Sequence, residues 1–365
     1  MAETFYPMLG DFYLIGKNVQ ENKPALYHYI EETPKHTDKD LRIVQFGCDL
    51  HFNCISVKAF DEFEKALTNI IDRYDQRGML IANLTPGSLS TVRTHDDYKQ
   101  RRKHMSSAIG INQCSKYINM MIKAIDDSLS KVSENQEIDF TMVIKEATLA
   151  IIITIFFGYN ISEKIGKIKY ICPNTNETSY ISFERMYVNV TSNELAAQFS
   201  AKGKLLPFLQ HWKLINPFKS NAANALELAR VMREYLSKGE DKDCIYQQLM
   251  SLGKFDKEAI LMDCILMMIA GYDTVAHSLT SVLHFLKKNP DKMEKLNKEL
   301  EKSGLHNIEG KSGKDLMKAY MECDYLTYVG KESLRLDAPV MQSVMYEIYQ
   351  DTEICGVKLE KGQHI

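Results

Sequence analysis

Three residues that weaken a helix or resist burial interrupt the most apolar stretch of the chain, residues 260–286. Gly271 costs a helix about 1 kcal/mol relative to Ala, and Thr274 can turn its hydroxyl onto the carbonyl group one turn back. A buried Asp273 needs a hydrogen-bonding or charged partner. Three locally unfavourable residues so close together inside a buried helix indicate a functional site, because local rules tend to fail where function lies. They could equally be a satisfied polar pair beside a glycine that lets another helix approach.

A second pattern combines a tyrosine with a run of basic residues. Tyr98 and Arg102 lie one helical turn apart, with Lys99, Arg101 and Lys103 beside them. A basic helical face of this kind could clamp an anionic group or dock an acidic partner. It could also be an ordinary solvated helix surface.

A third pattern is a pair of opposite charges. Glu332 and Arg335 are three positions apart and share one face of a predicted helix. At a surface such a pair is worth only about 0.3 kcal/mol. Alone, the pair therefore indicates no more than a solvated helix.

These patterns fall on predicted helices that follow one another along most of the chain. Apolar spacing predicts helices over residues 58–71, 96–133, 139–158, 183–201, 221–238, 256–288, 290–302 and 323–336. Asp256 is a predicted helix start, and Pro290 suits the first turn of the next helix. The polar, glycine-containing stretch 304–314 predicts a loop.

The two ends of the chain carry predicted strands instead. Strand-forming residues predict a β-hairpin over 41–56, and the tail 351–362 predicts a second. The fold class is therefore mainly α (α+β), with a small sheet built from both chain ends. We expect a single domain, 1–365, with β-rich parts at about 41–57 and 344–365 and a helical part at about 58–337.

Composition excludes several classes of protein. The chain has 45 Lys and Arg against 48 Asp and Glu, a net charge of −3, and 45% apolar residues, which argues against a nucleic-acid binder and a disordered chain. The eight cysteines include no C-x-x-C pair, so free thiols are expected rather than a zinc site. Glu3 argues against a targeting signal, and the apolar runs 147–157 and 260–270 are shorter than the ~20 residues that cross a bilayer. The sequence as written predicts a cytoplasmic protein.

Together these segments resemble one family, the cytochrome P450 haem-thiolate monooxygenases. AGYDT, residues 270–274, is similar to the family's oxygen-side helix motif A-G-x-D/E-T, and KESLRL, residues 331–336, is similar to its E-x-x-R helix. YKQRR resembles the W-x-x-x-R helix at the haem edge, with Tyr98 in place of Trp. The first hairpin and FYPMLGDF near the start add weaker likenesses. The resemblance runs nearly end to end and implies a P450-like helical fold with a small β lobe.

On the oxygen side, the resemblance implies that haem lies beside the 270–274 helix. Thr274 would hydrogen-bond the bound dioxygen, and Asp273 would relay protons to it. Ala270 and Gly271 would line the haem, with Gly271 leaving room for oxygen next to the helix backbone.

At the haem edge and on the proximal side, the resemblance implies two further roles. Arg102 would pair with a haem propionate, and Tyr98 would hydrogen-bond nearby. Glu332 and Arg335 would be structural residues in a buried ion-pair network.

The implied reaction inserts one oxygen atom of O2 into an apolar organic substrate. Electrons would come from NADPH through a reductase partner that docks near Lys99, Arg101 and Lys103. A substrate lid is expected within residues 159–220. Four residues there could line a channel or pack as ordinary core: Phe199, Pro207, Phe208 and Trp212.

The sequence departs from the family at the expected iron ligand. The thiolate loop F-x-x-G-x-R-x-C-x-G does not occur in the 365 residues, and residues 345–346 lack the basic side chain expected near a propionate. His277 and His284 lie on the oxygen-side helix and are interpreted as packing residues rather than axial ligands. The sequence therefore assigns no metal ligand.

Two hypotheses follow. In the first, the chain is a haem monooxygenase truncated before its cysteine loop and inactive alone. It would associate with the endoplasmic reticulum membrane if an N-terminal anchor is missing as well. In the second, the chain is a haem-free, non-catalytic binding or interaction protein derived from the same family.

Overall fold

A computed structural model describes most of the helical part of the chain and most of the β-rich part. The described residues are 21, 39–46, 49–67, 70–73, 84–94, 96–130, 132, 139–158, 164–198, 218–238, 243–340 and 346–365. The FYPMLGDF segment and the four lid residues named above lie outside this set.

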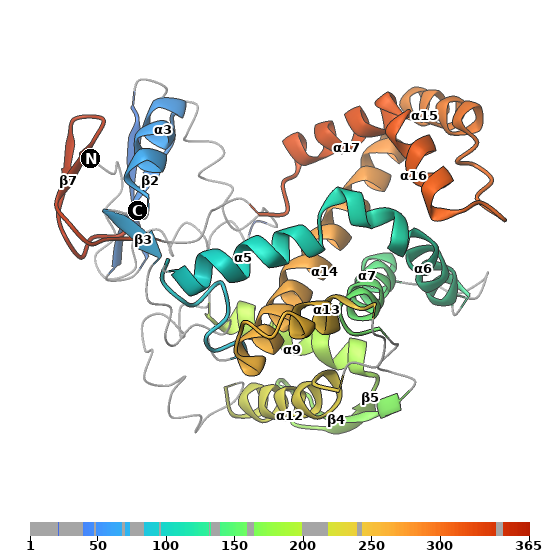
Figure 1. The fold of residues 1–365 in the computed structure, drawn as a ribbon, viewed down its shortest axis with the longest axis horizontal. Coiled ribbons are helices and arrows are strands. Elements are labelled where there is room, and N and C mark those ends of the chain that lie inside the picture. The colour runs from blue at the N-terminus through green and yellow to red at the C-terminus, as the bar shows by residue number, and fades with distance from the viewer. Residues whose placement is uncertain are drawn as a thin grey trace.

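The helical part forms the larger body of the molecule (Figure 1). Its helices are α5 (Asp96–Ala108), α6 (Ile111–Leu129), α7 (Phe140–Phe157), α9 (Phe183–Gln198), α12 (Phe218–Leu236), α13 (Ile245–Ser251), α14 (Lys257–Lys288), α15 (Pro290–Ser303), α16 (Gly313–Met321) and α17 (Asp324–Leu336). The long helix α14 runs through this body and contacts α7, α13, α15 and α17. The prediction of a mainly α fold is confirmed.

Helices α7 and α14 form the centre of the core. Asp256 caps α14 by accepting a hydrogen bond from the Ala259 amide at 2.9 Å, as predicted. Thr148 of α7 donates to the Tyr272 carbonyl of α14 at 3.1 Å, which ties the two helices together. At 18 and 32 residues, both helices are longer than their apolar runs suggested, and by length and composition both could cross a membrane. Buried core helices share that property, and these two contribute to one large apolar cluster.

The β lobe joins the two ends of the chain, as predicted. Strands β1 (Leu41–Phe46) and β2 (Asp49–Cys54) form the first hairpin, and β7 (Thr352–Ile354) and β8 (Val357–Leu359) form the last. Between them, β3 (Ile71–Arg73) pairs antiparallel with β6 (Tyr346–Ile348). Helix α3 (Val57–Ala66) covers the lobe. A second, separate apolar cluster lies here, formed by Ala59, Ile71, Ile348, Ile354 and Leu359.

Several elements differ from the sequence prediction, including α13, which was not predicted, and the predicted helix 58–71, which ends at Ala66. The predicted helix 96–133 is two helices, because the chain breaks at Gly110, the N-cap of α6. Part of the predicted loop 304–314 opens α16, where Ser312 accepts a hydrogen bond from the Asp315 amide at 3.2 Å. A hairpin of β4 (Ile168–Ile171) and β5 (Thr178–Ile181) was not predicted.

Candidate functional site

The 270–274 segment lies within α14, where two of its residues are engaged locally. The Thr274 hydroxyl donates to the Ala270 carbonyl at 2.7 Å, so its own proton is already used. Gly271 faces α7, because a Cβ atom at this position would collide with the δ-methyl group of Ile152. The structure therefore gives Gly271 a helix-packing role, the alternative that the sequence left open.

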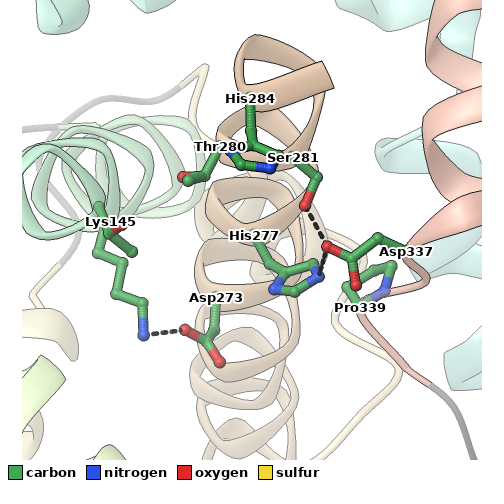
Figure 2. Close-up of a pocket in the computed structure, with 9 residues that line it drawn as sticks. Lys145, Asp273, His277, Thr280, Ser281, His284, Asp337 and Pro339 are labelled. Atoms are coloured by element: carbon green, nitrogen blue, oxygen red, sulfur yellow. Dashed lines mark hydrogen bonds and ion pairs between the residues drawn. The ribbon is translucent and has the colours of Figure 1, made fainter. Parts of the chain in front are cut away.

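Asp273 points into a polar cavity of about 380 Å³ (Figure 2). Its carboxylate lies 2.7 Å from the Lys145 ammonium group of α7. Across the same cavity, His277 Nε2 lies 3.1 Å from Asp337 Oδ2. Ser281 donates to the same Asp337 oxygen at 2.5 Å, which connects α14 to the end of α17. His284 also lines this cavity.

A second cavity, of about 410 Å³, collects positive charge at the junction of the β lobe and α5. Its lining residues are Leu67, Asp72, Arg73, Thr94, Tyr98, Lys99, Arg102, Lys103, Ser106 and Tyr346. Four of these side chains are cationic and one is anionic. The anion, Asp72, accepts hydrogen bonds from the Thr94 amide and hydroxyl at 3.0 and 2.8 Å.

Two guanidinium groups meet on one phenol in this cavity. Arg102 donates to Tyr98 Oη at 3.0 Å, as their spacing of one helical turn allows. Arg73 of β3 donates to the same oxygen, and its Cζ atom lies 4.3 Å from the Tyr98 ring centroid. We call these three residues the Arg73–Tyr98–Arg102 cluster. Within the described residues, neither arginine is paired with a carboxylate.

Sequence reasoning missed Arg73. It is the last residue of a three-residue strand and belongs to no motif in the sequence. Arg73 meets α5 through Tyr98, and its strand pairs with β6, more than 270 residues further along the chain, so the local pattern held no signal.

One predicted surface residue is buried. Arg101, expected beside Lys99 and Lys103 at a docking surface, lies inside the molecule against Asp263 of α14. Their side chains are 3% and 1% exposed, and the closest approach is 2.6 Å. The prediction for Arg101 is wrong because the sequence gave no sign of a carboxylate partner 162 positions away. Lys99 and Lys103 are exposed, as expected.

The Glu332–Arg335 pair forms, but it is not buried. Both guanidinium–carboxylate hydrogen bonds are 2.7 Å long. The side chains are 57% and 67% exposed. The described residues do not bury the pair, since none of them covers this face of α17, so the buried network stays a prediction.

The predicted site residues are divided between the two cavities. Asp273 lines the first, Tyr98 and Arg102 line the second, and Thr274 lines neither. None of the described cysteines lines either cavity. In the same described residues, no group of three or more His, Cys, Asp or Glu could hold a metal ion.

Comparison with known proteins decides the family. The family model for cytochrome P450 matches residues 17–365. The chain belongs to the cytochrome P450 family. It is 25% identical over 299 residues to the probable cytochrome P450 519C1 of Dictyostelium discoideum, covering 82% of this chain and 51% of that protein. It is also 31% identical over 134 residues to the geraniol 8-hydroxylase of Catharanthus roseus, covering 35% of this chain and 26% of that protein. The chain thus spans about half the length of the first relative and a quarter of the second.

Cytochrome P450 proteins carry haem, and one edge of this chain fits that group. Haem presents two propionate carboxylates, and guanidinium groups bind carboxylates with strong, charge-assisted hydrogen bonds. Arg73 and Arg102 supply two such groups at one cavity without a carboxylate of their own. The described residues fit the propionate edge, and they offer no thiolate beside it.

Proposed function

We propose that this chain is part of a haem-dependent monooxygenase that inserts one oxygen atom of O2 into an apolar organic substrate. In this proposal the Arg73–Tyr98–Arg102 cluster holds the carboxylate edge of the haem, and residues 270–274 of α14 lie on the oxygen side. The observation that carries the proposal is the convergence of two guanidinium groups on one phenol oxygen beside a cavity.

Haem, when bound, supplies the chemistry of oxygen activation. The chain's own residues bind, orient and move protons. Arg73 and Arg102 orient the carboxylates. The Thr274 hydroxyl donates its proton in a hydrogen bond to the Ala270 carbonyl, so its oxygen can accept a further hydrogen bond. Asp273, held by Lys145, can accept a proton at its carboxylate.

The same proposal includes a reductase partner that takes electrons from NADPH and passes them to this protein. Lys99 and Lys103 are exposed and one turn apart on α5, so they offer a basic surface to an acidic partner. They flank Arg102, which places this basic surface next to the cluster. Arg101 is buried against Asp263 and is therefore not part of the basic surface.

The runner-up function is a haem-free, non-catalytic binding protein. The observation in its favour is that no described cysteine lines either cavity. The experiment below separates the two functions.

The test is a titration of the purified chain with haemin, followed by the Soret absorbance. We expect the wild type to bind one equivalent and R73A/R102A to bind at least about 100-fold more weakly, since each charge-assisted bond is worth about 1.5–3 kcal/mol. R185A/R230A is the matched control, because it removes the same charge from exposed ion pairs on α9 and α12. A wild type that binds no haemin would favour the haem-free function, and equal loss in both variants would reject the cluster as the binding edge.

A second measurement tests the activity of the whole gene product that contains these residues. After reduction and addition of carbon monoxide, it should show the Soret shift typical of thiolate-ligated haem. Haem incorporation without that shift contradicts the monooxygenase proposal.

A further inference from the structure

A chain of hydrogen bonds leads from α14 to the Arg73–Tyr98–Arg102 cluster through the backbone of a single residue. The Leu89 amide donates to Asp263 Oδ1 at 2.7 Å. The carbonyl group of the same residue accepts from Arg73 Nη1. Arg73 donates through its other terminal nitrogen to Tyr98. Leu89 thus links a buried carboxylate to the guanidinium group that faces the cavity.

The same carboxylate also holds α5 directly. Arg101 donates to both Asp263 oxygens, from Nε at 2.8 Å and from Nη2 at 2.6 Å. Arg101 also donates to the Gly87 carbonyl at 2.9 Å, two residues before Leu89. Asp263 therefore fixes both the turn that holds Arg73 and the helix that carries Arg102.

This geometry has a cost that a packing role alone does not explain. Burial raises the pKa of the Asp263 carboxyl, while Arg101 and the Leu89 amide oppose that shift. Replacing a buried ion pair with apolar residues is often neutral or stabilising. Nearby, the guanidinium groups of Arg73 and Arg102 both donate to the Tyr98 hydroxyl, and their like charges repel each other unless an anion binds between them. Something must hold Arg73 in place, and the Leu89 carbonyl is its other acceptor.

We propose that Asp263 is a positioning residue for the carboxylate-binding cluster, acting on Arg73 through the Leu89 backbone and on Arg102 through Arg101. This inference rests on the proposed function, because it assumes that the cluster receives the two carboxylates of a porphyrin. Asp263 does not line the cavity. It sets where the guanidinium groups stand.

The test compares two metal-free ligands that differ only at the carboxylates: protoporphyrin IX and its dimethyl ester, with binding followed by porphyrin fluorescence. We expect the wild type to bind the diacid at least tenfold more tightly than the ester. The variant R101L/D263L removes the ion pair and the carboxylate that accepts a hydrogen bond from the Leu89 amide. In this variant the preference for the diacid should fall below threefold. In R101Q/D263N, whose amides can keep the hydrogen bonds to Leu89 and between the helices, it should be largely restored. A merely structural role would weaken both ligands equally and leave their ratio unchanged.

The outcomes separate the inference from the function it rests on. A wild type without diacid preference overturns both. A preference retained by R101L/D263L overturns only the role of Asp263. Should that variant fail to fold, amide exchange in the wild type gives the answer: the diacid, and not the ester, should slow exchange at Leu89 at least tenfold. Unchanged exchange at Leu89 overturns the inference.

Discussion

Two arginine–carboxylate pairs with the same chemistry lie in opposite surroundings in this chain. Arg101 and Asp263 are buried, whereas Glu332 and Arg335 are more than half exposed. Removing one partner of a buried pair leaves an uncompensated charge, whereas an exposed pair is screened by water.

We therefore expect D263A to lower the free energy of unfolding by about 3–5 kcal/mol and E332A by less than about 1 kcal/mol. Urea unfolding of the two variants checks this, and E332A serves as the control for losing one carboxylate. The exposed pair should also weaken in high salt. Equal losses in the two variants would contradict the burial of the Arg101–Asp263 pair.

Tyr272 gives a prediction for alkaline pH. Burial raises its pKa from 10.0 to about 12, and a hydrogen bond with Thr191 opposes this shift. A phenol with a raised pKa in the folded state stabilises the fold below pH 10, and this stabilisation is lost as pH rises towards 12. Two pKa units correspond to about 3 kcal/mol.

The measurement is the free energy of unfolding of the wild type and Y272F across this pH range. The wild type should lose about 3 kcal/mol more than Y272F. Parallel curves for the two proteins would show that Tyr272 ionises freely in the folded state.

At the residue scale, sequence reasoning found what lies close along the chain. Tyr98 and Arg102 meet because a helical turn separates them. The partners of Arg101 and the position of Arg73 depend on contacts across the fold, so no local pattern could reveal them. The likeness to a known family supplied the meaning of the Tyr98–Arg102 spacing, and the structure supplied the third member.

At the element scale, the approach of α7 to α14 depends on Gly271. In G271A the new methyl group must displace Ile152, and overpacking typically costs about 1–3 kcal/mol. Alanine in a helix gains about 1 kcal/mol over glycine when space allows. The I152V substitution removes the δ-methyl group and creates that space.

The effect of G271A on stability should therefore have opposite signs in the wild type and in I152V. We expect G271A to destabilise the wild type and to stabilise I152V, as measured by thermal unfolding of the four proteins in the cycle. The same sign in both backgrounds would show that Ile152 does not restrict position 271.

Helix boundaries show why some elements were predictable and others were not. The start of α14 could be predicted, because Asp256 precedes a long apolar run and caps it. The short helix α16 was not predicted, and its first two residues lay in the predicted loop 304–314, because its polar, glycine-bearing start hides a capped helix in which only Gly313 and Leu316 are buried. The β4–β5 hairpin is held to α12 by Asn224, which bonds the backbone of Ile171. Such a contact has no signature in the hairpin's own sequence.

At the scale of the whole molecule, the β lobe and the helical body have separate apolar clusters. Ile348 is fully buried in the lobe, opposite Ile71. We expect I348A to cost the lobe about 2–5 kcal/mol and to speed amide exchange in β3 and β6, with little change in α7 and α14. I153A in the helical cluster is the control and should show the converse. Loss of protection in both parts together would show that they unfold as one unit.

The pairing of β3 with β6 also determines the order in which the molecule can fold during its synthesis. Ile71 pairs with Ile348, which lies 277 residues further along the chain. At a synthesis rate of about 5–20 residues per second, Ile348 is added roughly 15–55 s after Ile71. Throughout that interval the helical body can fold on the ribosome, while the edge of β3 has no strand beside it. An unpaired edge is a site where chains aggregate. The edge of β3 in a nascent chain should therefore need protection by a chaperone until β6 leaves the ribosome.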